Sequence, residues 1–179
     1  MGREKSLLPI NGRTMIEHVI ATMRPLCGSL CIVADDTESF RFTGIRVIPD
    51  LVQNAGPLGG IHAALTTLGV PEILCSPCDT PLVSTQLLQY IRERADHAPA
   101  CVARAADGLH PLCGIYRSSA LPAIERAITA GRFKLIDVLQ ELGAAVVDIT
   151  PGLPFYHPDL FLNVNDPEGL ARVTELLRV

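Results

Sequence analysis

The sequence contains no tryptophan, and aromatic residues make up only 4% of its 179 positions. Proteins that bind single-stranded nucleic acid stack the bases on aromatic side chains, so this scarcity argues against that class. The chain also lacks an excess of positive charge, because its formal net charge is −4. Binding to a nucleic-acid backbone requires a cationic face, so we expect no nucleic-acid partner. Small anionic ligands stay compatible with this charge, since local basic groups or a metal ion can hold them.

Long apolar runs are also missing. No apolar stretch approaches the length that spans a membrane, and the first residues lack the apolar core of a signal peptide. We therefore expect a cytoplasmic protein without a membrane partner. With 48% hydrophobic and 19% charged residues, the composition is that of a globular α/β domain. The length supports one such domain, which we expect to cover residues 1–179.

Cysteine is too sparse for a disulfide framework. The six cysteines lie at positions 27, 31, 75, 78, 101 and 113, and we interpret them as small core residues. Cys75 and Cys78 form a C-x-x-C pair, for which redox and zinc roles are the alternatives. A thioredoxin-type pair begins a helix, whereas Pro77 and Pro81 indicate a loop here. A zinc site would need further ligands at a recognisable spacing.

Hydrophobic periodicity predicts several helices. A capping box of Thr14 and Glu17 begins the first helix, which we expect to precede any strand. Further helices are predicted after the glycines near position 60, from Ser84, from about position 119 and after Asp166.

Short apolar runs between these helices predict strands at residues 30–34, 45–48, 73–75, 100–103, 110–116 and 145–149, with a last extended piece at 161–164. The strand at 110–116 follows the turn-forming residues Asp107 and Gly108, which favours an antiparallel direction for it. The alternation of strands and helices predicts a three-layer α/β domain.

The stretch ILCSPCDTP, residues 73–81, is the most informative part of the chain. Asp79 comes just past the carboxyl end of a predicted buried strand, and ligands of open parallel α/β sheets bind outside those ends. Mg²⁺ takes carboxylate oxygens together with substrate phosphates, so Asp79 is a candidate metal ligand. The alternative is a solvated turn aspartate flanked by proline.

Glycine and charged residues mark other candidate positions. Gly56, Gly59 and Gly60 precede a helix, where glycine lets a phosphate or sugar approach the unpaired N–H groups, and a simple turn is the alternative. Asp50 follows the strand at 45–48. Lys5 lies in the turn-rich first segment, where an exposed surface lysine is the alternative.

Several motifs together resemble a known family. MGREKSLLPINGRTMIEHV, IPDL, GPLGGIHAAL, SPCDTPLVS, HPLCGIY and FLNVNDPEGL occur in the order found in the molybdenum cofactor guanylyltransferases. The resemblance covers essentially the whole chain. It implies a Rossmann-like nucleotidyltransferase fold with a mostly parallel sheet, of the nucleotide-diphospho-sugar transferase type. It also implies transfer of GMP from GTP to molybdopterin, with Mg²⁺ as cofactor and release of pyrophosphate.

The resemblance implies catalytic roles for four residues. Asp79 matches the family's metal-binding aspartate, and Lys5 matches the lysine that grips the triphosphate. Asn163 and Asn165 match the asparagines associated with the pterin side and the reacting phosphate. Phosphoryl transfer asks the protein for positioning and charge neutralisation rather than covalent chemistry, so these residue types suit the reaction.

Nucleotide contacts are implied for four more residues. Asp50 matches an aspartate on the nucleoside side, and Gly56, Gly59 and Gly60 match a loop that lets the nucleotide lie close to the backbone. The small-molecule partners implied are GTP and molybdopterin. Transient contact with other cofactor-biosynthesis or molybdoenzyme-maturation proteins is compatible with the resemblance, and we expect a monomer.

The sequence departs from the family pattern in two places. The family begins LAGGxSxRMGxxK, whereas this chain begins at the MG of that motif, so we expect the flanking strands to lack a central partner. A misassigned start would explain this and predicts LAGGxSxR in frame upstream; a trimmed chain or a natural short form are the alternatives. Ala34 is followed by Asp35 and Asp36 where many members carry asparagine for the base. A CTP-dependent relative and a catalytically silent pterin- or nucleotide-binding protein therefore stay open.

Overall fold

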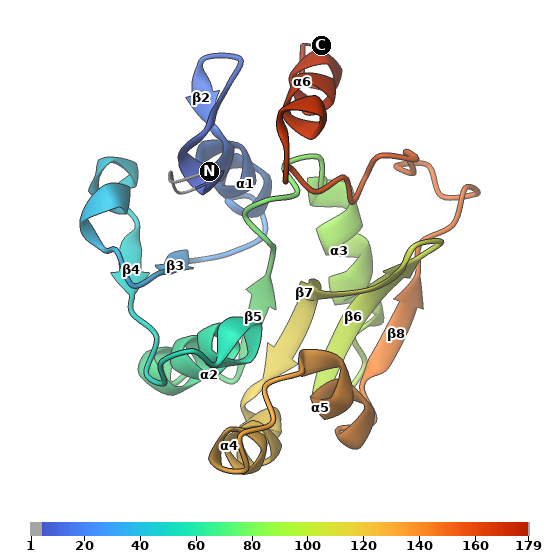
Figure 1. Cartoon of the computed structure of the whole chain (residues 1–179). Coiled ribbons are helices and arrows are strands. Elements are labelled where there is room, and N and C mark those ends of the chain that lie inside the picture. Colours follow the sequence, from blue (N-terminus) through green and yellow to red (C-terminus); the bar gives the residue numbers. More distant parts are fainter. Residues whose placement is uncertain (1–4, 179) are drawn as a thin grey trace.

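The computed structural model describes residues 5–178, so the motif positions 1–4 lie outside the described part of the chain. Figure 1 shows a mixed α/β architecture. The helices are α1 (Met15–Met23), α2 (Gly56–Leu68), α3 (Thr85–Arg94), α4 (Leu121–Thr129), α5 (Leu135–Glu141) and α6 (Pro167–Leu176), with short 3₁₀ helices η1 (Lys5–Leu7), η2 (Glu38–Thr43) and η3 (Ser118–Ala120). The strands are β1 (Pro9–Ile10), β2 (Arg13–Thr14), β3 (Cys31–Val33), β4 (Arg46–Ile48), β5 (Glu72–Cys75), β6 (Ala100–Ala105), β7 (Gly108–Arg117) and β8 (Ala145–Asp148).

The largest sheet has the strand order β5-β7-β6-β8. β7 runs antiparallel to both β5 and β6, and β8 runs parallel to β6, so three of these four strands share one direction. The predicted antiparallel direction of the strand at 110–116 is thereby confirmed. β3 and β4 form a separate parallel pair, and no described strand lies hydrogen-bonded between β3 and β5. Within residues 5–178, β3 pairs with β4 and β5 pairs with β7.

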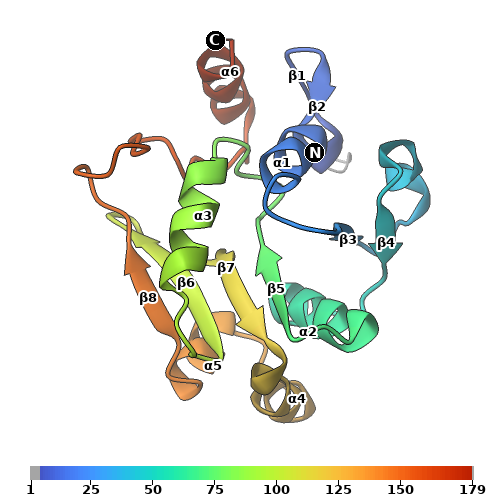
Figure 2. The ribbon, with the colours of Figure 1, turned by 180° about the vertical axis from the view of Figure 1, so that it is seen from behind.

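Helices cover both faces of the four-stranded sheet. Along β6, Ala100 and Val102 pack against α2, α4 and α5, whereas Cys101 and Ala103 pack against α3 on the opposite face. This alternation follows from the two-residue repeat of a strand. Figure 2 shows α3 lying along the face of the sheet opposite α5. The predicted three-layer arrangement is confirmed.

Several predicted helix starts are also confirmed. The Glu17 carboxylate accepts hydrogen bonds from the Thr14 N–H and hydroxyl groups, both at 2.7 Å. Ser84 caps α3, and the Asp166 carboxylate accepts the Gly169 N–H at 2.7 Å at the start of α6. Of the described helices, none is long and apolar enough to cross a bilayer.

Three features differ from expectation. A β1–β2 hairpin precedes α1, because Asn11 and Gly12 adopt the positive φ angles, 49° and 83°, of a tight hairpin turn. Helix α5 was not predicted, although Leu135, Val138 and Leu139 have helical spacing and are buried. The segment at 161–164 forms no strand; it crosses the sheet's end as irregular chain.

Candidate active site

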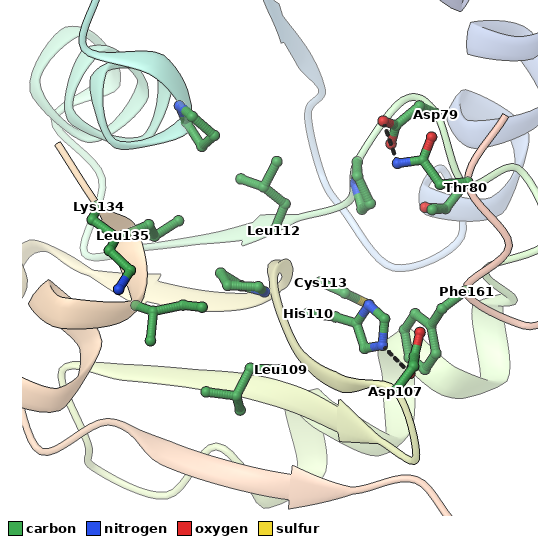
Figure 3. A pocket seen from close by; sticks show the side chains of 15 residues that line it. Asp79, Thr80, Asp107, Leu109, His110, Leu112, Cys113, Lys134, Leu135 and Phe161 are labelled. Carbon is green, nitrogen blue, oxygen red and sulfur yellow. Dashed lines mark hydrogen bonds and ion pairs between the residues drawn. The ribbon is translucent and has the colours of Figure 1, made fainter. Parts of the chain in front are cut away.

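Asp79 lies in the turn that follows β5, and its carboxylate is oriented by Asn163. The Asn163 Nδ2 group donates a hydrogen bond to Asp79 Oδ2 at 2.7 Å. The backbone of the same segment is tied to this turn, because the Val164 N–H donates to the Asp79 carbonyl at 2.9 Å. These two bonds hold the loop before α6 against the carboxyl end of β5. Figure 3 shows the Asp79 carboxylate at the rim of a cavity.

Lys5 joins this arrangement from the other end of the chain. Its Nζ atom donates a hydrogen bond to Asn165 Oδ1 at 2.7 Å. Asn165 is two positions from Asn163, and the Asn165 N–H donates to the Asn163 carbonyl at 3.1 Å. The structure therefore brings together Lys5, Asp79, Asn163 and Asn165, the four positions singled out from the sequence. The result is a cation and a carboxylate, each held by an asparagine amide.

Asp50 lies at the end of β4 and has an unsatisfied carboxylate. Its Oδ1 atom is buried and has no hydrogen-bond partner. Burial raises the pKa of the Asp50 carboxyl above its ordinary value, and the neighbouring Asp35 carboxylate raises it further. Buried acceptors without a donor are uncommon in folded proteins and call for an explanation. A ligand hydroxyl or amino group is the chemistry that would satisfy this oxygen.

The three candidate glycines lie inside helix α2 rather than in a loop before it. Gly56 is the first residue of the helix and has a φ angle of 56°, which favours glycine. A Cβ atom on Gly59 would lie only 2.9 Å from the Ala55 Cβ, so this glycine allows close packing within the fold. Gly60 faces Asp50, whose Oδ1 atom would be 3.9 Å from an added Cβ. Gly56 and Gly60 line a cavity together with Asp50, and Gly59 does not.

A cavity of about 470 Å³ opens beside Asp79. The His110 and Phe161 rings stack in its wall with centroids 3.7 Å apart and planes 8° from parallel. The His110 Nε2 atom lies 2.9 Å from Asp107 Oδ1, which fixes the ring (Figure 3). Sequence reasoning placed His110 in a strand and did not identify this pair, because no local pattern connects it with Phe161, 51 positions away.

The residues around Asp79 fit a magnesium ion held jointly with substrate. Within residues 5–178, no cluster of three or more His, Cys, Asp or Glu side chains could hold a metal alone. Mg²⁺ does not need such a cluster, since it binds through one or two carboxylates, waters and substrate phosphates. The Asp79 carboxylate, oriented by Asn163, would supply one hard oxygen ligand. Lys5, which binds Asn165 two positions from Asn163, suits the phosphates that complete such a site.

Thiol chemistry has no support in this site. All six cysteines are free thiols, and Cys101 and Cys113 are buried, as the core interpretation expects. Burial raises the pKa of the Cys75 thiol to about 12, so it is protonated at neutral pH. A thiolate is needed both for redox reactivity and for zinc binding. Cys78 is exposed, so it is not part of the core.

Comparisons with known proteins agree with this geometry. The family model described as the MobA-like NTP transferase domain matches residues 1–146. The molybdenum cofactor guanylyltransferase of Desulfosudis oleivorans is 30% identical over 180 residues, which cover 99% of this chain and 89% of the relative.

Solved structures show the same relationship. The crystal structure of molybdopterin-guanine dinucleotide biosynthesis protein A from Archaeoglobus fulgidus superimposes with a TM-score of 0.82 at 26% identity, covering 98% of this chain and 91% of that chain. The 2-C-methyl-D-erythritol 4-phosphate cytidylyltransferase from Thermus thermophilus has a TM-score of 0.74 at 18% identity, covers 98% of this chain and 94% of that chain, and shares the fold. The chain belongs to the MobA-like NTP transferase family and is a nucleotidyltransferase of the molybdenum cofactor guanylyltransferase type.

Proposed function

We propose that the protein transfers GMP from GTP to molybdopterin, with Mg²⁺, to give molybdopterin guanine dinucleotide and pyrophosphate. The observation that carries the proposal is the cluster of Lys5, Asn165, Asn163 and Asp79, in which one short segment, residues 163–165, binds both a cation and a carboxylate through its asparagine side chains. This is the charge pattern that a nucleoside triphosphate and its metal require. We further propose that the reaction takes place in the cytoplasm and that the protein acts as a monomer.

The transfer is an in-line displacement at the α-phosphorus of GTP. An oxygen of the acceptor's phosphate forms a bond to this phosphorus, and the bond to the β-phosphate bridging oxygen breaks, so that pyrophosphate leaves. The nucleophile is already an anion, so no general base is required. Lys5 offsets the negative charge that accumulates on the leaving phosphates. Asp79 would hold Mg²⁺, which supplies charge neutralisation on the phosphates when bound.

The other residues would position the substrates. Asp50 would accept a hydrogen bond from the nucleoside, since its buried Oδ1 has no partner. The N-terminus of α2, which begins at Gly56, would offer its first backbone N–H groups to a phosphate. The cavity of about 470 Å³ beside Asp79 would receive the acceptor, and the flat stack of His110 and Phe161 suits a planar pterin ring.

The test follows pyrophosphate release from GTP and molybdopterin in the presence and absence of Mg²⁺. The proposal expects product only with Mg²⁺. It also expects the rate of pyrophosphate release to fall by at least about a hundredfold in Asp79→Asn, because the oriented carboxylate is removed. Glu38→Gln is the matched control, since Glu38 is an exposed carboxylate that pairs with Arg41 within its own 3₁₀ helix. Product formation by Asp79→Asn at the wild-type rate would show that the carboxylate has another role.

The choice of base is a separate point in the same assay. The residues after β3 are Asp35 and Asp36, where many family members carry asparagine, so CTP is the competing donor. We propose GTP on the strength of the guanylyltransferase relatives. Faster transfer from CTP than from GTP would assign the protein to the cytidylyl branch, and no transfer from either would favour a binding role.

A further inference from the structure

One short segment of the chain supplies three contacts of the candidate site. We call residues 159–166 the asparagine segment. Three of its side chains reach the site: Phe161 stacks on His110, Asn163 binds the Asp79 carboxylate and Asn165 binds Lys5. A shift of this segment would therefore disturb the cavity wall, the candidate metal ligand and the candidate triphosphate lysine at the same time.

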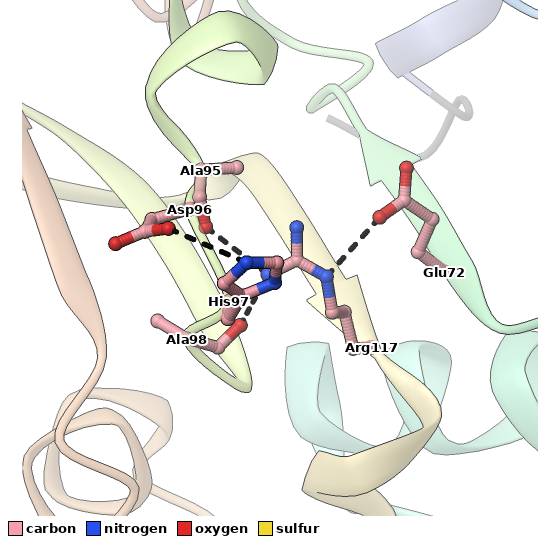
Figure 4. Close-up of polar contacts among 6 residues, drawn as sticks. All are labelled: Glu72, Ala95, Asp96, His97, Ala98 and Arg117. Atoms are coloured by element: carbon pink, nitrogen blue, oxygen red, sulfur yellow. Dashed lines mark hydrogen bonds and ion pairs between the residues drawn. The ribbon is translucent and has the colours of Figure 1, made fainter.

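The β5 side of these contacts is fixed by the sheet. β7 pairs along the whole of β5, which leads into the Asp79 turn. At the start of β5, the Arg117 guanidinium donates to the Glu72 carboxylate at 3.2 Å and to the Ala95 carbonyl at 3.0 Å, as Figure 4 shows. Strand pairing and this clamp hold one side of the site, so its geometry depends on how the asparagine segment is held on the other side.

The asparagine segment has no helix or strand of its own. Residues 149–166, all of which the structure describes, are irregular between β8 and α6. The middle of the segment is held by the Val164 N–H, which donates to the Asp79 carbonyl at 2.9 Å. Its end is held where the Asp166 carboxylate caps α6. A third anchor holds its start.

That anchor is an ion pair between Asp159 and Arg172 of α6. The Arg172 Nε and Nη2 groups donate to the two Asp159 carboxylate oxygens at 2.9 and 2.7 Å. Two parallel bonds fix the orientation of a carboxylate as well as its distance. The hydrogen bonds from Arg172 hold the pKa of the Asp159 carboxyl below its ordinary value, so the carboxylate is charged at neutral pH.

The helix that carries Arg172 is itself docked. The next residue, Val173, is buried in a cluster with Ile10 of the β1–β2 hairpin. From the same hairpin, the Asn11 side-chain amide donates to the Thr174 carbonyl at 2.9 Å. The ion pair therefore ties the start of the asparagine segment to an element that is packed in place.

We propose that Asp159 and Arg172 are positioning residues for nucleotidyl transfer, because their ion pair holds the asparagine segment in the shape that places its three contacts. Neither residue lines the cavity beside Asp79 or the cavity beside Asp50, so both act through the segment. The inference rests on the proposed function, which gives the three contacts their roles.

The pair differs from an ordinary surface ion pair. Exposed pairs contribute little to stability, and the Arg172 side chain is 59% exposed. The Asp159 side chain, however, is only 16% exposed, and the bonds to it are bidentate. The paired positions are also 13 apart, and the three contact side chains lie between them. Loss of the pair should therefore disturb the contacts of the site more than it lowers the overall stability.

The test compares Arg172→Gln with Arg104→Gln at a temperature well below the Tm of either variant. Arg104 is the matched control, because it forms a bidentate pair with Asp148 at 2.6 and 3.0 Å and is 53% exposed, but lies on β6. We expect Arg172→Gln to raise two quantities at least about fivefold, the Mg²⁺ concentration that gives half-maximal rate and the KM for the acceptor. Arg104→Gln should change neither. Arg172→Lys, which keeps the charge without the fork, should recover part of the loss.

A second measurement needs no turnover. Hydrogen exchange of the Val164 amide reports its bond to the Asp79 carbonyl, and it should be at least about fivefold faster in Arg172→Gln than in the wild-type protein. Amides inside α6 should keep their wild-type exchange rates, because the helix stays docked. Arg104→Gln should leave the exchange of Val164 unchanged.

Equal exchange of Val164 in Arg172→Gln and Arg104→Gln would refute the positioning role. A lower Tm of Arg172→Gln with unchanged dependence on Mg²⁺ and acceptor would refute it too, since the pair would then only stabilise the fold. Faster Val164 exchange in Arg172→Gln, together with no transfer by the wild-type protein, would refute the proposed function and support the anchoring of the segment.

Discussion

The contact between Asn163 and Asp79 offers a sharp test of the site. Replacing the amide nitrogen of Asn163 by an oxygen turns an attractive hydrogen bond into a repulsion between two carboxylates. In Asn163→Asp the donor Nδ2 becomes a carboxylate oxygen 2.7 Å from Asp79 Oδ2. Two unit charges at that distance repel by about 1.5 kcal/mol at the dielectric constant of water, and by more where solvent is partly excluded. For a domain of this size the loss corresponds to a fall in Tm of about 3–6 °C.

Magnesium should reverse this loss. A pair of carboxylates is a better Mg²⁺ site than one, so the ion should raise the Tm of Asn163→Asp by more than it raises that of the wild-type protein. The assay is thermal unfolding at neutral pH and low ionic strength, first with a chelator and then with increasing Mg²⁺.

The matched control is Asn165→Asp, the same substitution two positions along the chain. Asn165 accepts a hydrogen bond from Lys5 at 2.7 Å, so a carboxylate there forms an ion pair instead of a repulsion. Its Tm should be unchanged or slightly raised, as for an exposed salt bridge, and should respond to Mg²⁺ as the wild-type protein does. Equal Tm values for the two variants in chelator would refute the assigned geometry. A fall in Asn163→Asp that Mg²⁺ does not reverse would refute the metal assignment.

Three further predictions concern other parts of the site. The pKa of the Asp50 carboxyl is raised in the folded protein, so its ionisation lowers the stability as the pH rises from the pKa of the unfolded state through that of the folded state. Asp50→Asn should therefore raise the Tm at pH 7 more than at pH 4. An equal gain at both pH values would contradict the burial argument. Gly59→Ala should lower the free energy of unfolding, measured in urea, by about 1–3 kcal/mol because its Cβ would lie 2.9 Å from the Ala55 Cβ. Gly60→Ala should be tolerated. A larger loss of stability in Gly60→Ala than in Gly59→Ala would show that Gly59 is not tightly packed. Phe161→Ala should raise the KM for the acceptor several-fold and leave the KM for the nucleotide unchanged, and a change in the nucleotide KM alone would move the acceptor elsewhere.

Local sequence signals predicted the elements whose formation depends on local chemistry. Thr14 with Glu17, and Asp166 with Pro167, each satisfy helix N–H groups within a few residues, so the starts of α1 and α6 could be read directly. The Asn11-Gly12 turn of the β1–β2 hairpin is an equally local signal, and the predicted order, in which a helix precedes any strand, is wrong because it omits this hairpin.

Tertiary contacts decided what the glycines and the aromatic pair do. The sequence placed Gly56, Gly59 and Gly60 next to a helix, but only packing against Ala55 and Asp50 separates a glycine needed for the fold from one facing a ligand. The stack of His110 on Phe161 joins a strand to an irregular segment 51 positions away, and no spacing rule spans that distance.

The sequence by itself determined the family, the alternation of helices and strands, and the residue types that meet a triphosphate and its metal, because these follow from motifs and periodicities that are contiguous in the chain. The tertiary structure decided which atoms face one another. Asp79 and Asn163, and Lys5 and Asn165, are paired only because the loop before α6 closes over the carboxyl end of β5.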